Sequence, residues 1–315
     1  MTDTVICLEA LSGRETWNRQ CPGQPQEYGS SGTLCVAEDR CYFVSSAGCA
    51  YCLRLEDGGE VWRVKVRSAS HASFLVADGL GVVPAGELMA LDAGSGRVIW
   101  TQPKVKTAYN SPVLWRCDNA VYLICNMKTS IACVELATGK LLWTVPGGQY
   151  SSASLTGDHM AVLTNDKDAG LSVYELAAAE PRLLWSFPFT DRGASPVIYD
   201  GNVYAVGGGY PTGGKALCVR LDTGEKTWER DVGDGSEIAS SIVADGKLIT
   251  VVERTWLLMM SATPHEANVL AEADTSIKFS TSPAIANGNL YLRLQNSVAC
   301  YDLTAPATAA SATGR

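Results

Sequence analysis

Side chains that could bind a ligand or move protons recur just upstream of seven similar segments. Each segment is short and apolar and begins near a serine: Ser31, Ser73, Ser111, Ser152, Ser195, Ser240 and Ser282. The residues that precede these serines are aromatic, polar and of both charges, whereas ordinary loop tips are mostly serine, glycine, asparagine and aspartate. They include Glu27, Tyr28, His71, Tyr109, Asn110, Gln149, Tyr150, Asp191, Arg192, Glu237, Lys278 and Phe279.

If the seven segments converge in the fold, this set favours a small-molecule site. Tyrosines could stack on a flat or sugar-like ligand, and the two cations could hold a carboxylate or phosphate. The ligand-binding candidates are Tyr28, Tyr109, Asn110, Tyr150, Arg192, Lys278 and Phe279. His71 with Glu237 or Glu27 could move protons near neutral pH, which makes these three the catalytic candidates. The alternative is that the side chains pair with one another and only fill the space between the segments.

The elements that position these residues belong to an internal repeat. Six tryptophans are separated by 45, 38, 43, 42 and 43 residues: Trp17, Trp62, Trp100, Trp143, Trp185 and Trp228. A glycine lies four residues before five of them, as in Ala90–Trp100, which reads ALDAGSGRVIW. An apolar run, a turn with glycine free to adopt positive φ and a second apolar run ending in tryptophan predict a β-hairpin.

A second pair of strands precedes each hairpin. The first of the pair is one of the serine-led segments, such as Ser195–Tyr199, and an Asp-Gly or Asn-Gly turn leads into the next, such as Val203–Val206. Each unit therefore contains four antiparallel strands in about 42 residues, as in the blades of a β-propeller. Seven serine-led strands predict an all-β, seven-bladed propeller in which the N- and C-terminal strands share one blade. One surplus strand leaves an eight-bladed ring with an incomplete blade as the alternative.

The repeat of a small residue, Leu-Asp, two residues, Ser/Thr-Gly, three residues and tryptophan resembles the signature of PQQ-like repeat propellers. The resemblance covers residues 5–302 and implies a fold shared by quinoprotein dehydrogenases, the propeller lipoprotein of outer-membrane β-barrel assembly and sensor domains. Many of the dehydrogenases carry adjacent cysteines over the quinone, and this chain has no Cys-Cys pair. No set of Glu, Asn and Asp forms a convincing calcium site either. We therefore expect no PQQ redox chemistry and no cofactor.

The cysteines at one position of the repeat are expected to be small buried core residues rather than a metal or redox site. Cys7, Cys52, Cys133 and Cys218 each lie ten residues before a repeat tryptophan, at the place of Ala90, and Cys300 occupies the matching place in the last repeat. Cys49 and Cys52 form a C-x-x-C spacing, but residues i and i+3 of a strand point to opposite faces. We therefore expect no metal.

Composition and chain ends suggest location and partners. The net charge of −8 makes nucleic acid an unsuitable partner, and no apolar run is long enough to insert into a membrane. The start, MTDTVICLEA, has no signal-peptide pattern, and together with eleven cysteines it favours a cytoplasmic location. Residues 1–302 are expected to form a single propeller domain, and residues 303–315 a disordered tail. The pattern is compatible with a monomer.

Three functions remain open at this stage. In a propeller the first strand of each blade lines the central channel, so the candidates above would surround one channel mouth. The first function is binding of a small molecule or peptide there. The second is a cofactor-independent enzyme of the lyase, cyclase or isomerase type that uses His71 and a nearby carboxylate. The third is a protein-interaction scaffold.

Overall fold

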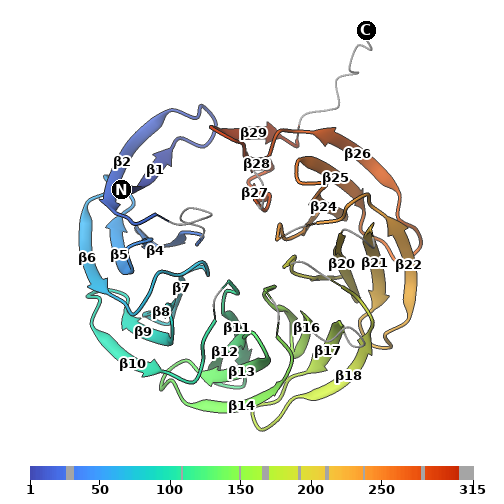
Figure 1. Cartoon of the computed structure of the whole chain (residues 1–315), viewed down its shortest axis with the longest axis horizontal. Coiled ribbons are helices and arrows are strands. Elements are labelled where there is room, and N and C mark those ends of the chain that lie inside the picture. Colours follow the sequence, from blue (N-terminus) through green and yellow to red (C-terminus); the bar gives the residue numbers. More distant parts are fainter. Residues whose placement is uncertain are drawn as a thin grey trace.

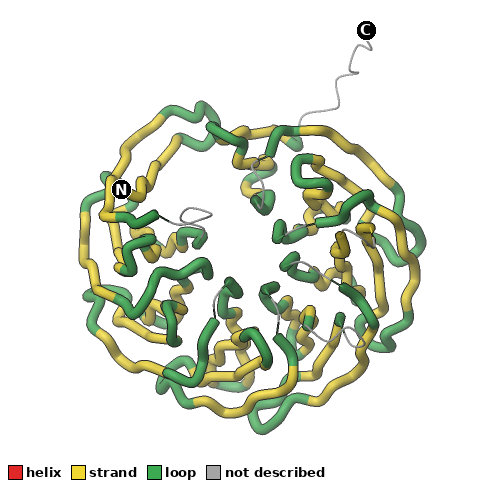
Figure 2. The backbone as a smooth tube through the Cα atoms, in the orientation of Figure 1, coloured by secondary structure: helices red, strands yellow, loops and turns green. Residues whose placement is uncertain are grey.

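The computed structural model describes residues 1–25, 32–107, 109–148, 150–164, 170–190, 193–209, 213–236, 238–277 and 281–304. Within these residues all regular elements are β-strands and none is a helix (Figure 2). The strands form antiparallel sheets arranged as a ring around a central axis, which confirms the predicted all-β propeller of four-stranded antiparallel blades (Figure 1).

Six sheets have four strands each, and within a sheet the strands pair in chain order. The first three are β3 (Cys35–Ala37), β4 (Arg40–Val44), β5 (Cys49–Arg54) and β6 (Glu60–Lys65); β7 (Leu75–Ala77), β8 (Leu80–Pro84), β9 (Leu88–Asp92) and β10 (Val98–Gln102); and β11 (Val113–Cys117), β12 (Ala120–Asn126), β13 (Ser130–Glu135) and β14 (Leu141–Pro146).

The next three are β15 (Ser154–Thr156), β16 (His159–Leu163), β17 (Leu171–Glu175) and β18 (Arg182–Phe187); β19 (Val197–Tyr199), β20 (Asn202–Gly209), β21 (Gly213–Arg220) and β22 (Lys226–Asp231); and β23 (Ile242–Ala244), β24 (Lys247–Val252), β25 (Trp256–Ser261) and β26 (Val269–Asp274). In each, the first strand lies nearest the axis and the fourth lies at the rim (Figure 1).

The ring closes differently from the expectation that the chain ends share one sheet. The seventh inner strand, β27 (Ala284–Ala286), continues into β28 (Asn289–Arg293) and β29 (Val298–Asp302), and this sheet has three strands. β1 (Thr2–Leu8) and β2 (Glu15–Pro22) pair only with each other in the described structure. Their hairpin lies in the ring between β27–β29 and β3–β6 (Figure 1). The surplus strand noted in the sequence is thus accommodated by two partial sheets.

Neighbouring blades are joined by the repeat tryptophans. Each indole Nε1–H donates to a backbone carbonyl in the turn between the third and fourth strands of the next blade, over distances of 2.7 to 3.0 Å. Where that turn contains a glycine, the indole also lies on it: a Cβ on Gly139 would come within 2.5 Å of Trp100. Gly139 has a φ of +72°, so this residue is required both by its backbone conformation and by its neighbour.

The core consists of side chains between blades, because each sheet buries both faces against its neighbours. One cluster joins Ile124, Cys133 and Trp143 of one sheet to Met160 and Val162 of the next. Cys52, Cys133 and Cys218 are fully buried opposite repeat tryptophans, as predicted. Cys7 is only half-buried. Cys300 is exposed because no outer strand covers β29 in the described structure.

Candidate functional site

The serines that precede the inner strands form a hydrogen-bonded series around the axis. The backbone N–H of each donates to the hydroxyl of the serine in the next blade, over 2.9 to 3.3 Å, from Ser73 through Ser111, Ser152, Ser195 and Ser240 to Ser282. The inner strands begin only after these serines. The sequence pattern had placed the serines inside the strands, but their N–H groups bond between blades instead of within a sheet. This series sets the spacing of the residues just upstream.

Three candidate residues meet upstream of the series. The rings of His71 and Tyr109 are stacked, with centroids 5.0 Å apart and planes 17° apart. Tyr109 and Tyr150 contact edge to face, with centroids 5.2 Å apart and planes 82° apart. We call His71, Tyr109 and Tyr150 the aromatic arc. Tyr109 and Tyr150 are 46% and 50% exposed, so the arc presents aromatic surface to solvent.

The arc continues across the next two blades through residues at the same repeat position. Gly193 lies between Tyr150 and Ile238, because a Cβ placed on it would be 3.3 Å from Tyr150 Cβ and 3.5 Å from Ile238 Cα. Ile238 is 50% exposed and has a φ of +67°, a conformation that β-branched residues rarely adopt. Strained backbone of this kind concentrates at functional sites. The sequence alone does not predict this conformation, because an isoleucine in a loop indicates no particular φ.

His71 is placed where a neutral imidazole is favoured. Partial burial lowers the pKa of His71 below its usual value of 6.5, because burial disfavours the charged form. Burial at this place therefore favours the neutral form of the imidazole. Glu27 and Glu237, the carboxylates expected to work with it, lie outside the described residues. The acid–base assignment of these three residues remains a prediction.

Asn110 has a place inside the fold. Its side chain is 2% exposed, and its Nδ2 donates to the backbone carbonyl of Ser151 at 3.1 Å. Asn126 Nδ2 donates to the same carbonyl at 2.8 Å, so two amides hold the loop that carries Tyr150. Asn110 thus supports the arc from within, and its predicted contact with a ligand is untested. Tyr28, Arg192, Lys278 and Phe279 lie outside the described residues.

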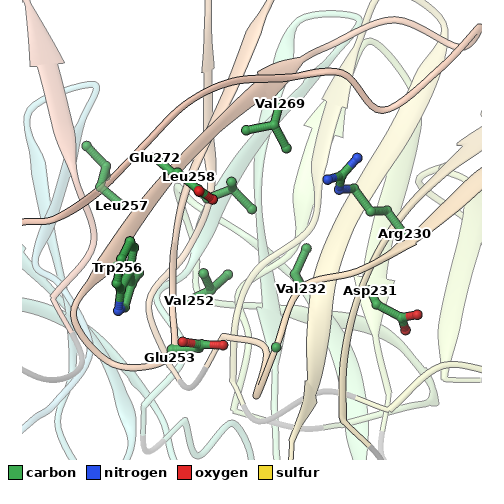
Figure 3. Close-up of a pocket in the computed structure, with 11 residues that line it drawn as sticks. Arg230, Asp231, Val232, Val252, Glu253, Trp256, Leu257, Leu258, Val269 and Glu272 are labelled. Atoms are coloured by element: carbon green, nitrogen blue, oxygen red, sulfur yellow. The ribbon is translucent and has the colours of Figure 1, made fainter. Parts of the chain in front are cut away.

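One pocket of the structure was not predicted from the sequence. It has a volume of about 300 Å³ and lies between β22 and the β24–β26 part of the following sheet (Figure 3). Trp256 forms one wall. The sequence offered one signal, because Trp256 falls outside the regular series of repeat tryptophans. Trp256 is 39% exposed.

Metal binding and membrane insertion each require a particular arrangement of residues. No three His, Cys, Asp or Glu side chains gather closely enough to hold a metal ion. No helical segment in the described part of the chain has the length and apolarity needed to cross a bilayer.

The fold is that of a PQQ-like repeat β-propeller. Most of its sheets are radial and four-stranded, six tryptophans donate to carbonyls of the next blade, and the serine series joins the inner strands. The family model of outer membrane protein assembly factor BamB matches residues 1–104 and 84–309. The chain therefore belongs to the BamB family, which confirms the resemblance seen in the repeat.

Individual relatives are distant in sequence. The chain is 21% identical over 298 residues to the outer membrane protein assembly factor BamB of Salmonella typhimurium, covering 87% of this chain and 74% of that protein. It is 23% identical over 279 residues to the BamB of Escherichia coli K12, covering 81% and 69%.

Solved structures share the fold. BamB from Moraxella catarrhalis superposes with a TM-score of 0.76 at 16% identity, covering 94% of this chain and 87% of that one. A europium-containing methanol dehydrogenase superposes with a TM-score of 0.68 at 12% identity, covering 92% and 78%. At such identities the likeness shows the architecture alone.

The comparisons overturn the expected cytoplasmic location. The family and the curated relatives are outer membrane protein assembly factors, which points away from the cytoplasm. The expectation depended on the first ten residues and on the cysteine count. Neither identifies a compartment: the cysteines in this fold are free thiols that mostly fill space between sheets, a role that operates in any compartment.

Proposed function

We propose that this chain is a protein-interaction scaffold in outer membrane protein assembly and that the aromatic arc is a contact surface for its partner. The match to the BamB family supports a role in outer membrane protein assembly. The proposal that the arc is a contact surface depends on one observation: Tyr109 and Tyr150 are exposed side by side on consecutive blades. Exposed tyrosines are enriched at protein interfaces because a rigid ring with a polar tip buries much area at low entropic cost.

The arc is preorganised for such contact. Stacking on His71 orients the Tyr109 ring, and the two amides described above fix the loop of Tyr150. The serine series anchors each of these segments to the next blade. A rigid aromatic surface loses little conformational entropy on binding, which increases affinity.

Site-specific photo-crosslinking in the source organism tests this function. With p-benzoylphenylalanine in place of Tyr150, we expect a crosslinked product that contains another component of outer membrane protein assembly, identified by mass spectrometry. The matched control carries the same group at Leu183 on β18, which is 49% exposed at the rim, and should give no such product. The Tyr109→Ala/Tyr150→Ala variant should weaken the complex by about tenfold or more, since interface aromatics contribute about 1–2 kcal/mol each. Equal crosslinking at both positions, or none at Tyr150, would contradict the proposal.

Small-molecule binding at the same arc is the second candidate. The stacked rings of His71 and Tyr109 favour it, because parallel aromatic planes also suit a flat ligand. The double tyrosine variant discriminates between the two candidates. A small-molecule site predicts a metabolite that stabilises the wild-type protein thermally but not the variant, while partner crosslinking is unchanged. An enzyme would in addition require a turnover that disappears in His71→Gln.

A further inference from the structure

The pocket beside Trp256 shares no lining residue with the aromatic arc. One side is the end of β22 with the following Val232 and Gly233; the other is the face of β24, β25 and β26 (Figure 3). Val252, Leu258 and Val269 form an apolar floor, and the indole of Trp256 stands at one end. No repeat tryptophan fills this part of the groove, since Trp228 bonds to Thr263 further along the same interface.

Trp256 is exceptional at its repeat position. It lies three residues before Met259, which pairs with Ala271 at the register where the other blades pair with their tryptophan. At the same register the five preceding complete blades carry Cys49, Glu87, Ser130, Gly170 and Lys215. An indole here is therefore not a requirement of the repeat. Because Trp256 pairs with Val252, the two side chains share the face that lines the pocket.

The turn before Trp256 has a strained backbone, and this turn places the Glu253 side chain in the pocket. Glu253 and Arg254 have φ values of +48° and +71°, two successive non-glycine residues in the left-handed region. The N–H of Glu253 donates to Gly235 O of the neighbouring blade at 3.0 Å, which holds the turn in this conformation. The Glu253 carboxylate then lies against Gly233, where a Cβ would come within 1.7 Å of Oε1.

The carboxylates of Glu253 and Glu272, beside the apolar floor, favour binding of a cation. Glu272 pairs with Leu258 and so extends from the same face of the sheet, and Figure 3 shows Val252 between its carboxylate and that of Glu253. Among the described residues, no side chain forms a hydrogen bond or ion pair with either carboxylate. Arg230, the basic residue among the described lining residues, instead donates through Nη1 to the carbonyl of Ala267 at 3.1 Å.

We propose that this pocket binds the arginine side chain of an extended segment of a partner protein. The methylene stem would lie on Val252 and Leu258, and the guanidinium would stack on Trp256 while donating to Glu253 and Glu272. Arginine fits better than lysine because its planar head can stack and donate to two carboxylates at once. The site is separate from the aromatic arc and does not depend on the function proposed for that surface.

The test titrates the full chain with a capped peptide, Ac-Val-Arg-Val-NH2, and with its citrulline counterpart. Citrulline keeps the shape of arginine but lacks the charge. The Trp256 indole N–H signal, identified by its loss in Trp256→Phe, is followed by NMR. We expect a saturable shift with the arginine peptide and at least about tenfold weaker binding of the citrulline peptide, as for a charge-assisted contact. Equal affinity for both peptides, or no shift with either, overturns the proposal.

Charge-neutral variants identify the carboxylates. Glu253→Gln/Glu272→Gln should weaken arginine-peptide binding by roughly fivefold, since partly exposed ion pairs are modest. The matched control, Glu180→Gln/Glu225→Gln, removes two exposed charges elsewhere and should bind as the wild type does. The Tyr109→Ala/Tyr150→Ala variant should also bind normally, so that failure of this site and failure of the arc are distinguishable. Unchanged affinity in the Glu253/Glu272 variant, with the fold retained by NMR, would refute the assignment.

Discussion

At the scale of single residues, the motif of glycine and tryptophan is explained by contacts between repeats. The glycine of one repeat does not serve the tryptophan four residues later; it accommodates the tryptophan of the preceding repeat. Trp100 lies on Gly139 and donates to Leu136 O at 2.8 Å, so one indole makes both a packing and a hydrogen-bonding contact with the next blade. Any side chain at such a glycine would separate the blades.

Substitution of Gly139 tests this contact. Gly139→Ala combines an unfavourable φ of +72° with a Cβ only 2.5 Å from the Trp100 ring, and we expect the free energy of unfolding to fall by roughly 2–4 kcal/mol. Gly157→Ala is the control, because Gly157 has a φ of +52° but no atom within 4 Å of the added Cβ. It should cost about 1 kcal/mol. Urea denaturation measures both, and equal losses would show that backbone conformation alone explains the glycines.

At the scale of elements, the inner strands depend on the serine series. β7, β15, β19, β23 and β27 have only three residues each, too few to hold their position by sheet pairing alone. The N–H-to-hydroxyl bonds connect β7, β15, β19 and β23 each to the next blade before the strand begins, and the last of them connects β27 to the preceding blade. The same bonds set the separation of His71, Tyr109 and Tyr150. The recurring serines of the sequence are thus connectors between blades.

Removal of one hydroxyl should weaken one bond of the series. Ser152→Ala deletes the acceptor of the Ser111 N–H, while the Ser152 N–H still donates to Ser195. We expect a loss of about 1–2 kcal/mol in the free energy of unfolding and faster hydrogen exchange at Ser111. Ser68→Ala, at an exposed loop serine, should stay within about 0.5 kcal/mol of the wild type. Unchanged exchange at Ser111 would show that this hydroxyl is dispensable.

At the scale of the whole molecule, burial is unequal around the ring. Leu123 and Ile124 on β12 are completely buried, whereas Ile6 on β1 is 52% exposed and Val298 on β29 is 54% exposed. The difference arises because the partial sheets β1–β2 and β27–β29 lie next to each other and each lacks strands that the complete blades have. Fewer buried contacts leave these two sheets with a lower local free energy of opening.

Hydrogen exchange should reveal this inequality. Backbone amides of β1 and β29 are expected to exchange at least roughly a hundredfold faster than those of β12 and β13, because local opening there requires little loss of buried surface. The β16–β17 pair, also within a complete blade, is the control and should resemble β12–β13. Uniform protection around the ring would mean that the molecule opens only as a whole.

The sequence by itself determined the repeat unit, the antiparallel pairing within it and the propeller, because these follow from local turns, strand alternation and a fixed spacing. It also selected His71, Tyr109 and Tyr150, since each precedes the same serine of its repeat. Only the tertiary structure decided that their rings touch, that Asn110 is buried and that Trp256 borders a pocket. It also decided that the chain ends form two separate sheets. Those outcomes depend on contacts between different blades, about 40 residues apart in the chain, and local patterns carry no information about which side chains meet across such a distance.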